Sequence, residues 1–338
     1  MKKSLLIALL VLFITQSCNQ TKKSEQNYEY KNLDEIPDSI KVGNITILNL
    51  FKYQILAHKN NHYDSTMIVQ KVYNPHKDLW NNCYGTIFGE ENSSKFNNER
   101  GMIEWNKTIY TDNKDFFDDR VKEILNIDLE KTLKSNLDKF QKLVPHQPQA
   151  KISILFTPVQ GIGFGGCNAN EFCFELNNKD YDVAYTIEKG IPHELNHLVY
   201  EKFRKEHTNS NSALTQTIDE GFACYFTWVF FDKKEPKYKF VEEMNENEWN
   251  WYMSNEKEIY TSLKTYFNDE SGDNPLLRND KFELFKDAPK SLNYWLGFRI
   301  VEKYIENNGK NSWKDIYGLD SKTVLQKSGY EEYIKTLK

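Results

Sequence analysis

The chain has 338 residues, with 44 basic and 49 acidic side chains and a formal net charge of −5 at pH 7. This acidic balance, together with the lack of a basic cluster along the sequence, argues against nucleic acid or an anionic lipid surface as a partner. Hydrophobic residues make up 39% and aromatic residues 14% of the chain, which is enough for a packed core in one large domain or two smaller ones.

The N-terminus predicts export. Two lysines after the initiating Met precede an apolar run at 5–14, an order that is typical of a secretion signal, and the run is too short to span a bilayer. Its end, Thr15-Gln16-Ser17-Cys18, resembles a bacterial lipobox, although Thr15 and Gln16 differ from the usual residues. The resemblance implies that Cys18 becomes the acylated N-terminus of the mature protein, and ordinary cleavage without acylation is the alternative.

We therefore expect residues 1–17 to form a lipoprotein signal peptide and the polar segment 18–33 to be a tether between the lipid and the folded part. Loss of the two lysines of the signal changes the formal charge to about −7. The expected location is the bacterial cell envelope, lipid-anchored on the periplasmic face of the inner membrane or in the outer membrane. The sequence leaves the oligomeric state open.

The region 34–146 is expected to be mostly helical. Apolar residues recur at helical spacing in 50–59 and again in 115–143, where they predict one or two amphipathic helices that face a core. The histidines of this region lack the spacing of a metal site, so none of them is expected to bind metal: His58, His62, His76 and His146.

Two buried strands are predicted at 151–157 and 171–176, with a glycine-rich stretch at 161–166 between them. These glycines match G-x-G-x-x-G, but a dinucleotide site requires them to open a helix, and here a second strand follows. We expect a bend instead. A strand with an exposed edge in this region could bind an extended peptide by β-augmentation.

The segment from about 183 to 204 has a helical pattern and contains His193-Glu194-Leu195-Asn196-His197. Residues four apart on a helix share a face, so both imidazoles can reach one metal ion while Glu194 lies beside them. Two imidazoles suit zinc and leave room for a third ligand and a water, from which Glu194 can take a proton. Pro192 requires the helix to begin there or to kink.

The third ligand is expected from a second helical pattern at 217–226, where an acidic pair interrupts nearly continuous hydrophobicity. A buried carboxylate is costly unless it is paired or bound to metal, so Asp219 and Glu220 need a partner. Glu220 is the preferred ligand, and Asp219 is the alternative or a partner of a ligand imidazole. Gly221 and Ala223 are small enough to let this helix approach its neighbour closely.

Other candidates for the third ligand fit less well. Glu201 lies two turns along the helix from His193, which is too far for the same ion on a straight helix, and His207 lies beyond the expected helix end. The third histidine of the metzincin pattern is absent, because Phe occupies position 203.

The cysteines at 18, 83, 167, 173 and 224 do not have the spacing of a zinc ribbon. If Cys18 is lipidated, four remain, and Cys167 and Cys173 are close enough to close a small disulfide loop in an exported protein. Buried, reduced cysteines are the equal alternative.

The motif helix followed by a Glu-Gly-x-Ala helix resembles the gluzincin metallopeptidases and, more closely, a bacterial family of predicted zinc-dependent proteases. The similarity extends from about His76-Lys-Asp-Leu-Trp80 to Asn293-Tyr-Trp-Leu-Gly-Phe-Arg-Ile-Val301. It implies a zinc hydrolase without naming the substrate. Pro192 is unusual before the first ligand, and Cys224 stands where some gluzincins have a supporting Asp.

The resemblance also implies a role for Tyr294. In gluzincin aminopeptidases, a tyrosine that begins a Tyr-x-x-Gly helix donates a hydrogen bond to the oxyanion, and Tyr294 to Gly297 has this form. A phenol near zinc can stabilise the developing negative charge. A tyrosine buried in the core is the alternative.

The remaining chain predicts helices in 240–268 and 313–337, with a loop at 269–287 near the entrance of a cleft. We therefore expect an α+β fold in which a small sheet packs on a zinc-binding helix, as in zincins, with a mainly helical C-terminal lobe. The N-terminal helical region would cover 34–146 and the zincin-like catalytic region 147–338.

The sequence as a whole predicts a zinc-dependent metallopeptidase that hydrolyses peptide bonds in a peptide or protein substrate. One zinc ion, held by His193, His197 and Glu220, would activate a water, with Glu194 as general base. A non-catalytic zinc-binding lipoprotein and a zinc hydrolase of a non-peptide bond are the alternatives. The intact Glu194 favours an enzyme, because a structural zinc site needs no base.

Overall fold

The computed structural model describes residues 33–59, 62–81, 93–157, 164–168, 170–179 and 182–338, and the side chains of 164–168 are excepted. The expectations for the signal peptide, the tether, Cys18 and Cys83 therefore lie outside the described residues. Within the described ranges, none of the helices combines the length and the hydropathy that crossing a membrane requires.

The fold is α+β, as expected, with a five-stranded mixed sheet in the order β1-β2-β3-β5-β4. The strands are β1 (Ser39–Val42), β2 (Ile45–Asn49), β3 (Ala150–Leu155), β4 (Phe164–Asn168) and β5 (Glu171–Glu175). Strands β2, β3 and β5 are parallel, and β1 and β4 are antiparallel strands at the two edges. The central strand β3 is buried along nearly its whole length, which is typical of a parallel strand covered on both faces.

The predicted strands at 151–157 and 171–176 are confirmed as β3 and β5. The expected glycine-rich bend at 161–166 is wrong for residues 164–166, which are part of β4, and residues 161–163 lie outside the described residues. Strands β1 and β2 were not expected. Since β2 pairs with β3, the sheet includes segments from both sides of the expected boundary at 146/147.

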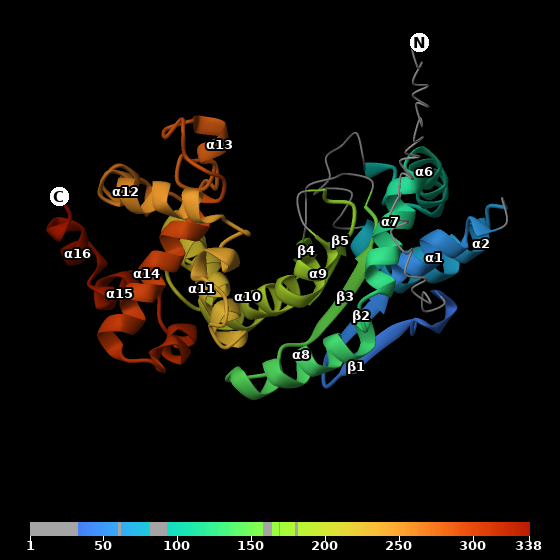
Figure 1. The fold of residues 1–338 in the computed structure, drawn as a ribbon, viewed down its shortest axis with the longest axis horizontal. Coiled ribbons are helices and arrows are strands. Elements are labelled where there is room, and N and C mark those ends of the chain that lie inside the picture. The colour runs from blue at the N-terminus through green and yellow to red at the C-terminus, as the bar shows by residue number, and fades with distance from the viewer. Residues whose placement is uncertain (1–32, 60–61, 82–92, 158–163, 169, 180–181) are drawn as a thin grey trace, which may run out of the picture. The chain divides into compact units, whose positions relative to one another are not determined.

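The helices appear in Figure 1 in chain order. In the first half they are α1 (Leu50–Leu56), α2 (Ser65–Met67), α3 (Lys77–Leu79), α6 (Glu99–Asp112), α7 (Lys114–Leu125) and α8 (Leu129–Leu143). In the second half they are α9 (Val183–Tyr185), α10 (Ile191–Arg204), α11 (Ala213–Phe230), α12 (Glu246–Leu263), α13 (Asn279–Phe282), α14 (Leu292–Asn308), α15 (Ser321–Ser328) and α16 (Tyr330–Thr336). The expected helical C-terminal half is confirmed, as is the expected loop at 269–287 apart from the short α13.

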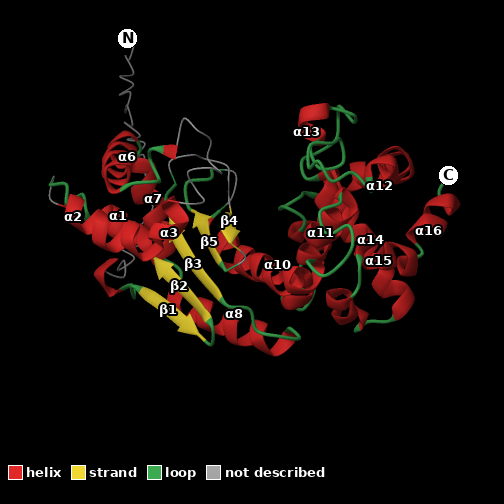
Figure 2. Cartoon of the chain, turned by 180° about the vertical axis from the view of Figure 1, so that it is seen from behind, coloured by secondary structure: helices red, strands yellow, loops and turns green. Residues whose placement is uncertain are grey.

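The sheet separates two apolar clusters. Successive residues of a strand point to opposite faces, so Ile154 of β3 belongs to a large cluster with α7 and α8, whereas Leu155 belongs to a smaller cluster with α1 and α6. Figure 2 shows α8 and α1 on different sides of the strands. The predicted amphipathic segment at 115–143 thus forms two helices, and Asp128 caps the second by accepting a hydrogen bond from the backbone N–H of Lys131 at 3.3 Å.

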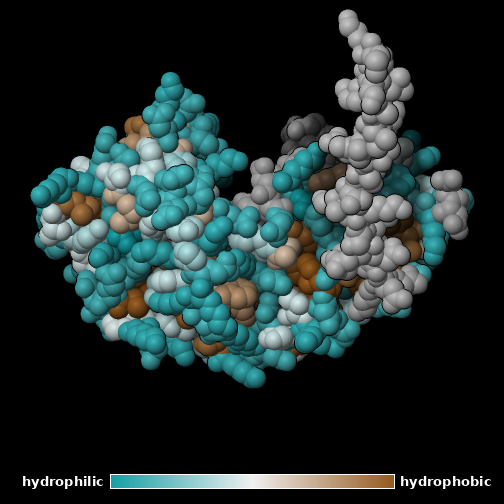
Figure 3. Space-filling view, viewed as in Figure 1, coloured by the Kyte–Doolittle hydropathy of each residue, from teal (hydrophilic) through white to brown (hydrophobic). Residues whose placement is uncertain are grey.

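The large cluster continues into the C-terminal helices, where α11 is buried on almost every side. In both ribbon views α10 lies between the sheet and these helices (Figures 1 and 2). Above α10 the surface is hollowed, as Figure 3 shows, and α12 and α13 border the hollow on the helical side. Among the described residues, the exposed large hydrophobic side chains are Phe282, the last residue of α13, and Leu284, which follows that helix.

Helices α11 and α14 cross in backbone contact at two glycines. A Cβ added to Gly221 would lie 1.9 Å from the carbonyl carbon of Gly297, and a Cβ added to Gly297 would lie 1.8 Å from the carbonyl oxygen of Thr217. Gly221 was expected to allow close packing, and it does, but the backbone that it meets is that of α14. The crossing brings the first turn of α14 beside the acidic pair of α11.

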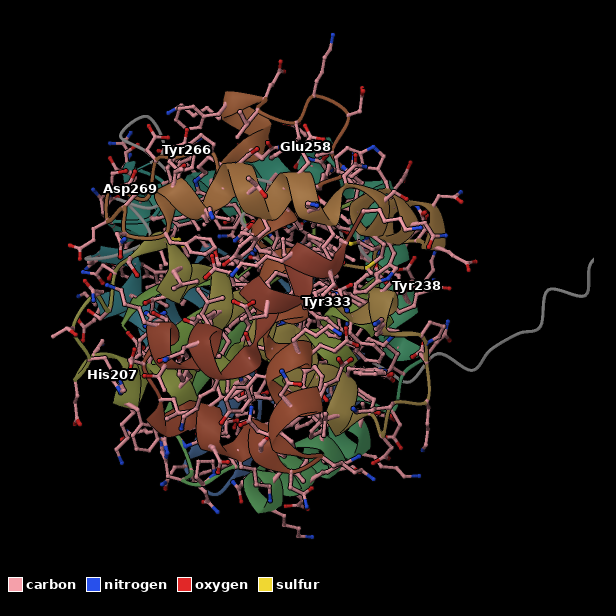
Figure 4. All side chains as sticks on the ribbon, turned by 90° about the vertical axis from the view of Figure 1, so that its left-hand side faces the viewer. His207, Tyr238, Glu258, Tyr266, Asp269 and Tyr333 are labelled. Atoms are coloured by element: carbon pink, nitrogen blue, oxygen red, sulfur yellow. The ribbon has the colours of Figure 1, made fainter. Side chains whose placement is uncertain are left out.

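A buried ion network holds α14 against its other neighbours. Arg299 donates to Glu256 of α12 across 2.9 Å, and the same carboxylate accepts from the hydroxyls of Tyr330 at 2.7 Å and Tyr333 at 3.0 Å. Figure 4 shows Tyr333 on the side of the molecule formed by the last helices. The opposite charges of Arg299 and Glu256 compensate for the hydration that both lose on burial. Helix α14 is therefore also anchored on the side away from α11.

Candidate metal centre

Helix α10 begins at Ile191, directly after the π-helix η6 (Thr186–Gly190). Pro192 is therefore in the first turn of α10, where a missing backbone N–H costs least. The segment that precedes α10 is also helical, but it has the wider hydrogen-bond pattern of a π-helix. Short π-helical turns often occur at functional sites. The two expectations for Pro192 are thus combined: the α-helix starts next to it, and the chain before it is helical in another pattern.

Three side chains from α10 and α11 converge. The Nε2 atoms of His193 and His197 are 3.2 Å apart, and Oε2 of Glu220 lies 3.2 Å from Nε2 of His197 and 3.5 Å from Nε2 of His193. These residues form a group whose ligand atoms all lie within 4.8 Å of one another. Zinc–ligand bonds of about 2.0–2.1 Å in a tetrahedron place ligand atoms about 3.3–3.4 Å apart. The observed spacing therefore fits one zinc ion.

The convergence also has an electrostatic consequence. Burial acts against protonation of His197, but the charges of Asp219 and Glu220 outweigh it and raise the pKa of this imidazole. Burial likewise acts to raise the pKa of Glu220, and the adjacent imidazoles of His197 and His193 hold it below its usual range instead. The point between the three side chains thus favours positive charge, which a proton or a metal ion can supply.

Asp219 lies behind His197. Its Oδ1 is 2.7 Å from Nδ1 of His197, and its Oδ2 accepts a hydrogen bond from Nη1 of Arg204. When Nδ1 donates to a carboxylate, Nε2 keeps its lone pair for a metal. Asp219 is therefore the partner of the His197 imidazole, a candidate ligand, and this position fits one of the two roles considered for it.

Cys224 lies behind the other imidazole. Its Sγ is 4.0 Å from Nδ1 of His193, which is on the far side of the ring from Nε2. Burial raises the pKa of the Cys224 thiol well above its ordinary value, and the charges of Glu242, Glu220 and Glu194 act in the same direction. The thiolate and not the thiol is a metal ligand, so among the described residues the candidate group consists of His193, His197 and Glu220, which would leave a fourth position of a tetrahedral ion open.

Glu194 is half-buried and is not one of the three converging groups. Burial raises the pKa of its carboxyl, against the opposing effect of His197 and His193, and the charges of Glu220 and Glu242 contribute to the rise. A carboxyl with a raised pKa next to the three converging side chains is suited to exchanging a proton with a group bound there.

Tyr294 lies in the first turn of α14, beside His193 of the candidate metal centre. Its ring centroid is 6.3 Å from that of His193, with 19° between the ring planes. Burial raises the pKa of the phenol well above its ordinary value, and the negative charges of Glu220, Glu242 and Glu194 add to this effect. The hydroxyl is thus kept protonated and can act as a hydrogen-bond donor at the centre.

The residues rejected as ligands lie elsewhere. Glu201 pairs with Lys205 at 2.7 Å, and His207 follows the end of α10 by three residues and is at the outer edge of the molecule in Figure 4. His76 is hydrogen-bonded to Ser153 at 2.9 Å. The remaining histidines with described ring contacts are His58, stacked on Tyr110, and His146, edge-on to Phe203.

Two residues near the centre were not predicted. Arg204 could have been found, because it follows His197 by seven residues, which is two helical turns on the same face. Glu242, whose charge acts on Glu194 and Tyr294, lies in the connection between α11 and α12, and no periodic pattern indicates where such a residue points. Its backbone has a φ of 51°, as few residues other than glycine do.

The cysteine pairing stays a prediction. Cys173 is buried on β5 and is opposite Gly165 of β4 in the register. The side chain of Cys167 lies outside the described residues.

A comparison with family models matches residues 130–326 to a family described as predicted Zn-dependent protease (DUF2268). The matched segment contains the three converging residues, Glu194 and Tyr294. No curated protein and no solved structure matches the chain.

Proposed function

The chain belongs to the family of predicted Zn-dependent proteases, and from this premise we propose that it is a metallopeptidase with one zinc ion held by His193, His197 and Glu220. The observation that carries the proposal is the convergence of two imidazole nitrogens and one carboxylate oxygen at separations of 3.2 to 3.5 Å. Two histidines and a glutamate are a ligand set of catalytic zinc, which keeps one position open.

When bound, zinc would act as a Lewis acid that polarises a water and the carbonyl of the peptide bond to be cut. Glu194 would accept the proton of the attacking water and pass it to the leaving amine. Tyr294 would donate its phenolic hydrogen to the oxygen on which negative charge develops. The proposed role of Tyr294 as hydrogen-bond donor is supported by the position of its ring beside His193. It is also supported by the pKa of the phenol, which burial raises.

The proposed substrate is a peptide or protein, and the packing of sheet and motif helix is proposed to be zincin-like. Strand β4 is at the edge of the sheet, so one side of its backbone has no partner among the described strands and could add an extended peptide as a further strand. Figure 3 shows a surface hollow above α10, the helix that carries His193 and His197, and such a hollow would give a peptide room to lie there.

Two alternatives make different predictions. A zinc-binding module without catalysis would have no use for Glu194, whose position beside the ligands supports an enzyme. A hydrolase of a non-peptide bond would use the same zinc and carboxylate, so only the identity of the cleaved substrate separates it from a peptidase.

The location is also a proposal. We propose that an acyl chain on Cys18 holds the protein on a bacterial membrane in the cell envelope, which the basic and apolar order of the N-terminus supports. Labelling cells with a fatty acid tests it: label that persists when Cys18 is replaced by Ala would refute the assignment.

The function is tested by Glu194→Gln, because this substitution keeps the size of the side chain and removes the proton acceptor. We expect the variant to bind one equivalent of zinc, as wild type does, and hydrolysis of a peptide found in a library digest to fall by about 10²–10⁴-fold. Glu206→Gln, at an exposed position just after α10, is the control and should keep full activity. A Glu194→Gln protein with zinc and an unchanged rate would contradict the mechanism.

A further inference from the structure

The carboxylate of Asp219 has two partners on two sides. Its Oδ1 faces Nδ1 of His197 at 2.7 Å, and its Oδ2 accepts from Nη1 of Arg204. The side chain of Asp219 is only 9% exposed. A buried carboxylate needs compensation for its lost hydration, and Arg204 supplies a full positive charge together with a directed hydrogen bond.

We propose that Arg204 is a positioning residue for the zinc ligand His197 and acts through Asp219. The inference rests on the proposed zinc site. An imidazole bound to zinc through Nε2 is oriented by the partner of its Nδ1. A carboxylate held only by that imidazole can rotate about its side-chain bonds, whereas one held at the other oxygen by a guanidinium keeps its direction. Arg204 therefore fixes the ring plane of His197 from two turns further along α10.

The geometry of α10 explains why an arginine does this. Residues seven apart on a helix lie on the same face, so Arg204 and His197 both face α11, and Asp219 of α11 fits between them. Among the described residues, the hydrogen bond of the Arg204 guanidinium is the one to Asp219, and its buried Nε has no partner. The guanidinium is thus directed to one carboxylate.

A basic residue in the last turn of a helix also stabilises that helix through its interaction with the helix dipole. This effect is the rival explanation for the presence of Arg204. The chain offers a control for it. Lys202 is in the same last turn, is exposed, and lies near the ring of Phe203, 5.9 Å from its centroid. Removal of its charge tests the dipole effect without touching Asp219.

The test measures zinc affinity by competition with a chromophoric chelator. We expect Arg204→Met and Asp219→Ala each to weaken zinc binding by about 10- to 100-fold, the usual effect of losing a partner of a ligand imidazole. Arg204→Lys should recover part of the loss, and Lys202→Met should bind zinc as wild type does. The far-UV circular dichroism spectrum and the thermal unfolding of the metal-free variants check that each of them folds.

The double variant Arg204→Met/Asp219→Ala decides how Arg204 acts. If Arg204 works through Asp219, its removal changes little once Asp219 is gone, and the double variant binds zinc within about threefold of Asp219→Ala alone. Independent effects that multiply would overturn the inference, as would wild-type affinity in Arg204→Met. Either of these two results would contradict the role of Arg204 and would leave the proposed zinc site itself unaffected. A wild-type protein that binds no zinc would instead refute the proposed function and this inference with it.

Discussion

Glu220 reaches the two histidines from a different helix, so its contribution to the site can be separated from that of the motif. We predict that Glu220→Ala weakens zinc binding by more than the 10- to 100-fold typical of losing an outer partner, because one of three direct ligands is lost. Glu201→Ala is the matched control: it removes the same charge from α10, where Glu201 pairs with Lys205. Chelator competition on both variants measures the difference, and equal losses would show that another residue is the third ligand.

A second prediction for a single residue concerns Tyr294. Tyr294→Phe keeps the ring beside His193 and removes only the hydroxyl, so we expect kcat to fall by about 10²–10³-fold, as when one oxyanion donor is lost, with zinc affinity unchanged. Tyr304→Phe, on the same helix, should keep the wild-type kcat. Steady-state kinetics on the library-derived peptide decide the question, and a kcat unchanged by Tyr294→Phe would leave Tyr294 as a packing residue.

The residues of the candidate metal centre differ in how well their positions could be predicted from the sequence. The spacing of His193, Glu194 and His197 on one helix is a local property, and it predicted their relative placement. Glu220 followed from the cost of a buried carboxylate. The partnership of Arg204 with Asp219 depends on how α10 and α11 cross, and no local pattern contains that angle.

Elements were predictable where the hydrophobic period was long. The segments that became α7, α8 and α10 have several turns of repeating apolar residues. In contrast, β1 has only four residues, and β2 runs without a break into α1 at Leu50, so neither stands apart as a strand in the sequence. Strand β4 was read as a bend because Gly165 and Gly166 have low strand propensity. Pairing with β5 stabilises it in spite of that composition.

The contact between α11 and α14 gives a prediction at the scale of elements. We expect Gly297→Ala to lower the free energy of unfolding by about 3 kcal/mol or more, since the new methyl would overlap the carbonyl oxygen of Thr217. Alanine would otherwise favour a helix by about 1 kcal/mol over glycine. Gly318→Ala, which meets nothing within 4 Å, is the control. Urea unfolding compares them, and equal midpoints would mean that the helices can separate at little cost.

At the scale of the whole molecule, His76 links stability to pH. The residue is 1% exposed, and burial lowers its pKa to about 3, with a smaller effect of Lys151. Because the unfolded chain binds a proton below its pKa of about 6.5 and the folded protein does not, the stabilising effect is complete above pH 6.5 and is lost as the pH falls towards 3.

At pH 4.5 the loss due to His76 alone should be about 3 kcal/mol relative to neutral pH. Urea unfolding of chelator-treated protein at pH 7.5 and 4.5 measures it, without interference from zinc release. His76→Gln removes the titrating group and retains an amide that can bond to Ser153, so this variant should lose less stability between the two pH values. The same pH dependence in both proteins would exclude His76 as the source.

The packing of α11 on α14 also has a consequence for the order of events during synthesis. All three side chains of the candidate metal centre have left the ribosome once residue 220 has emerged, but α14 begins only at Leu292, which follows on the order of ten seconds later at usual rates of translation. Until then the face of α11 that packs on α14 has no cover, and α11 is held towards α10 by contacts such as those of Tyr200 with Phe222 and of Arg204 with Asp219 alone. A fragment that stops between the two helices therefore carries the complete motif without the packing of α14 on Gly221, and zinc binding should be measured on chains that extend through α14.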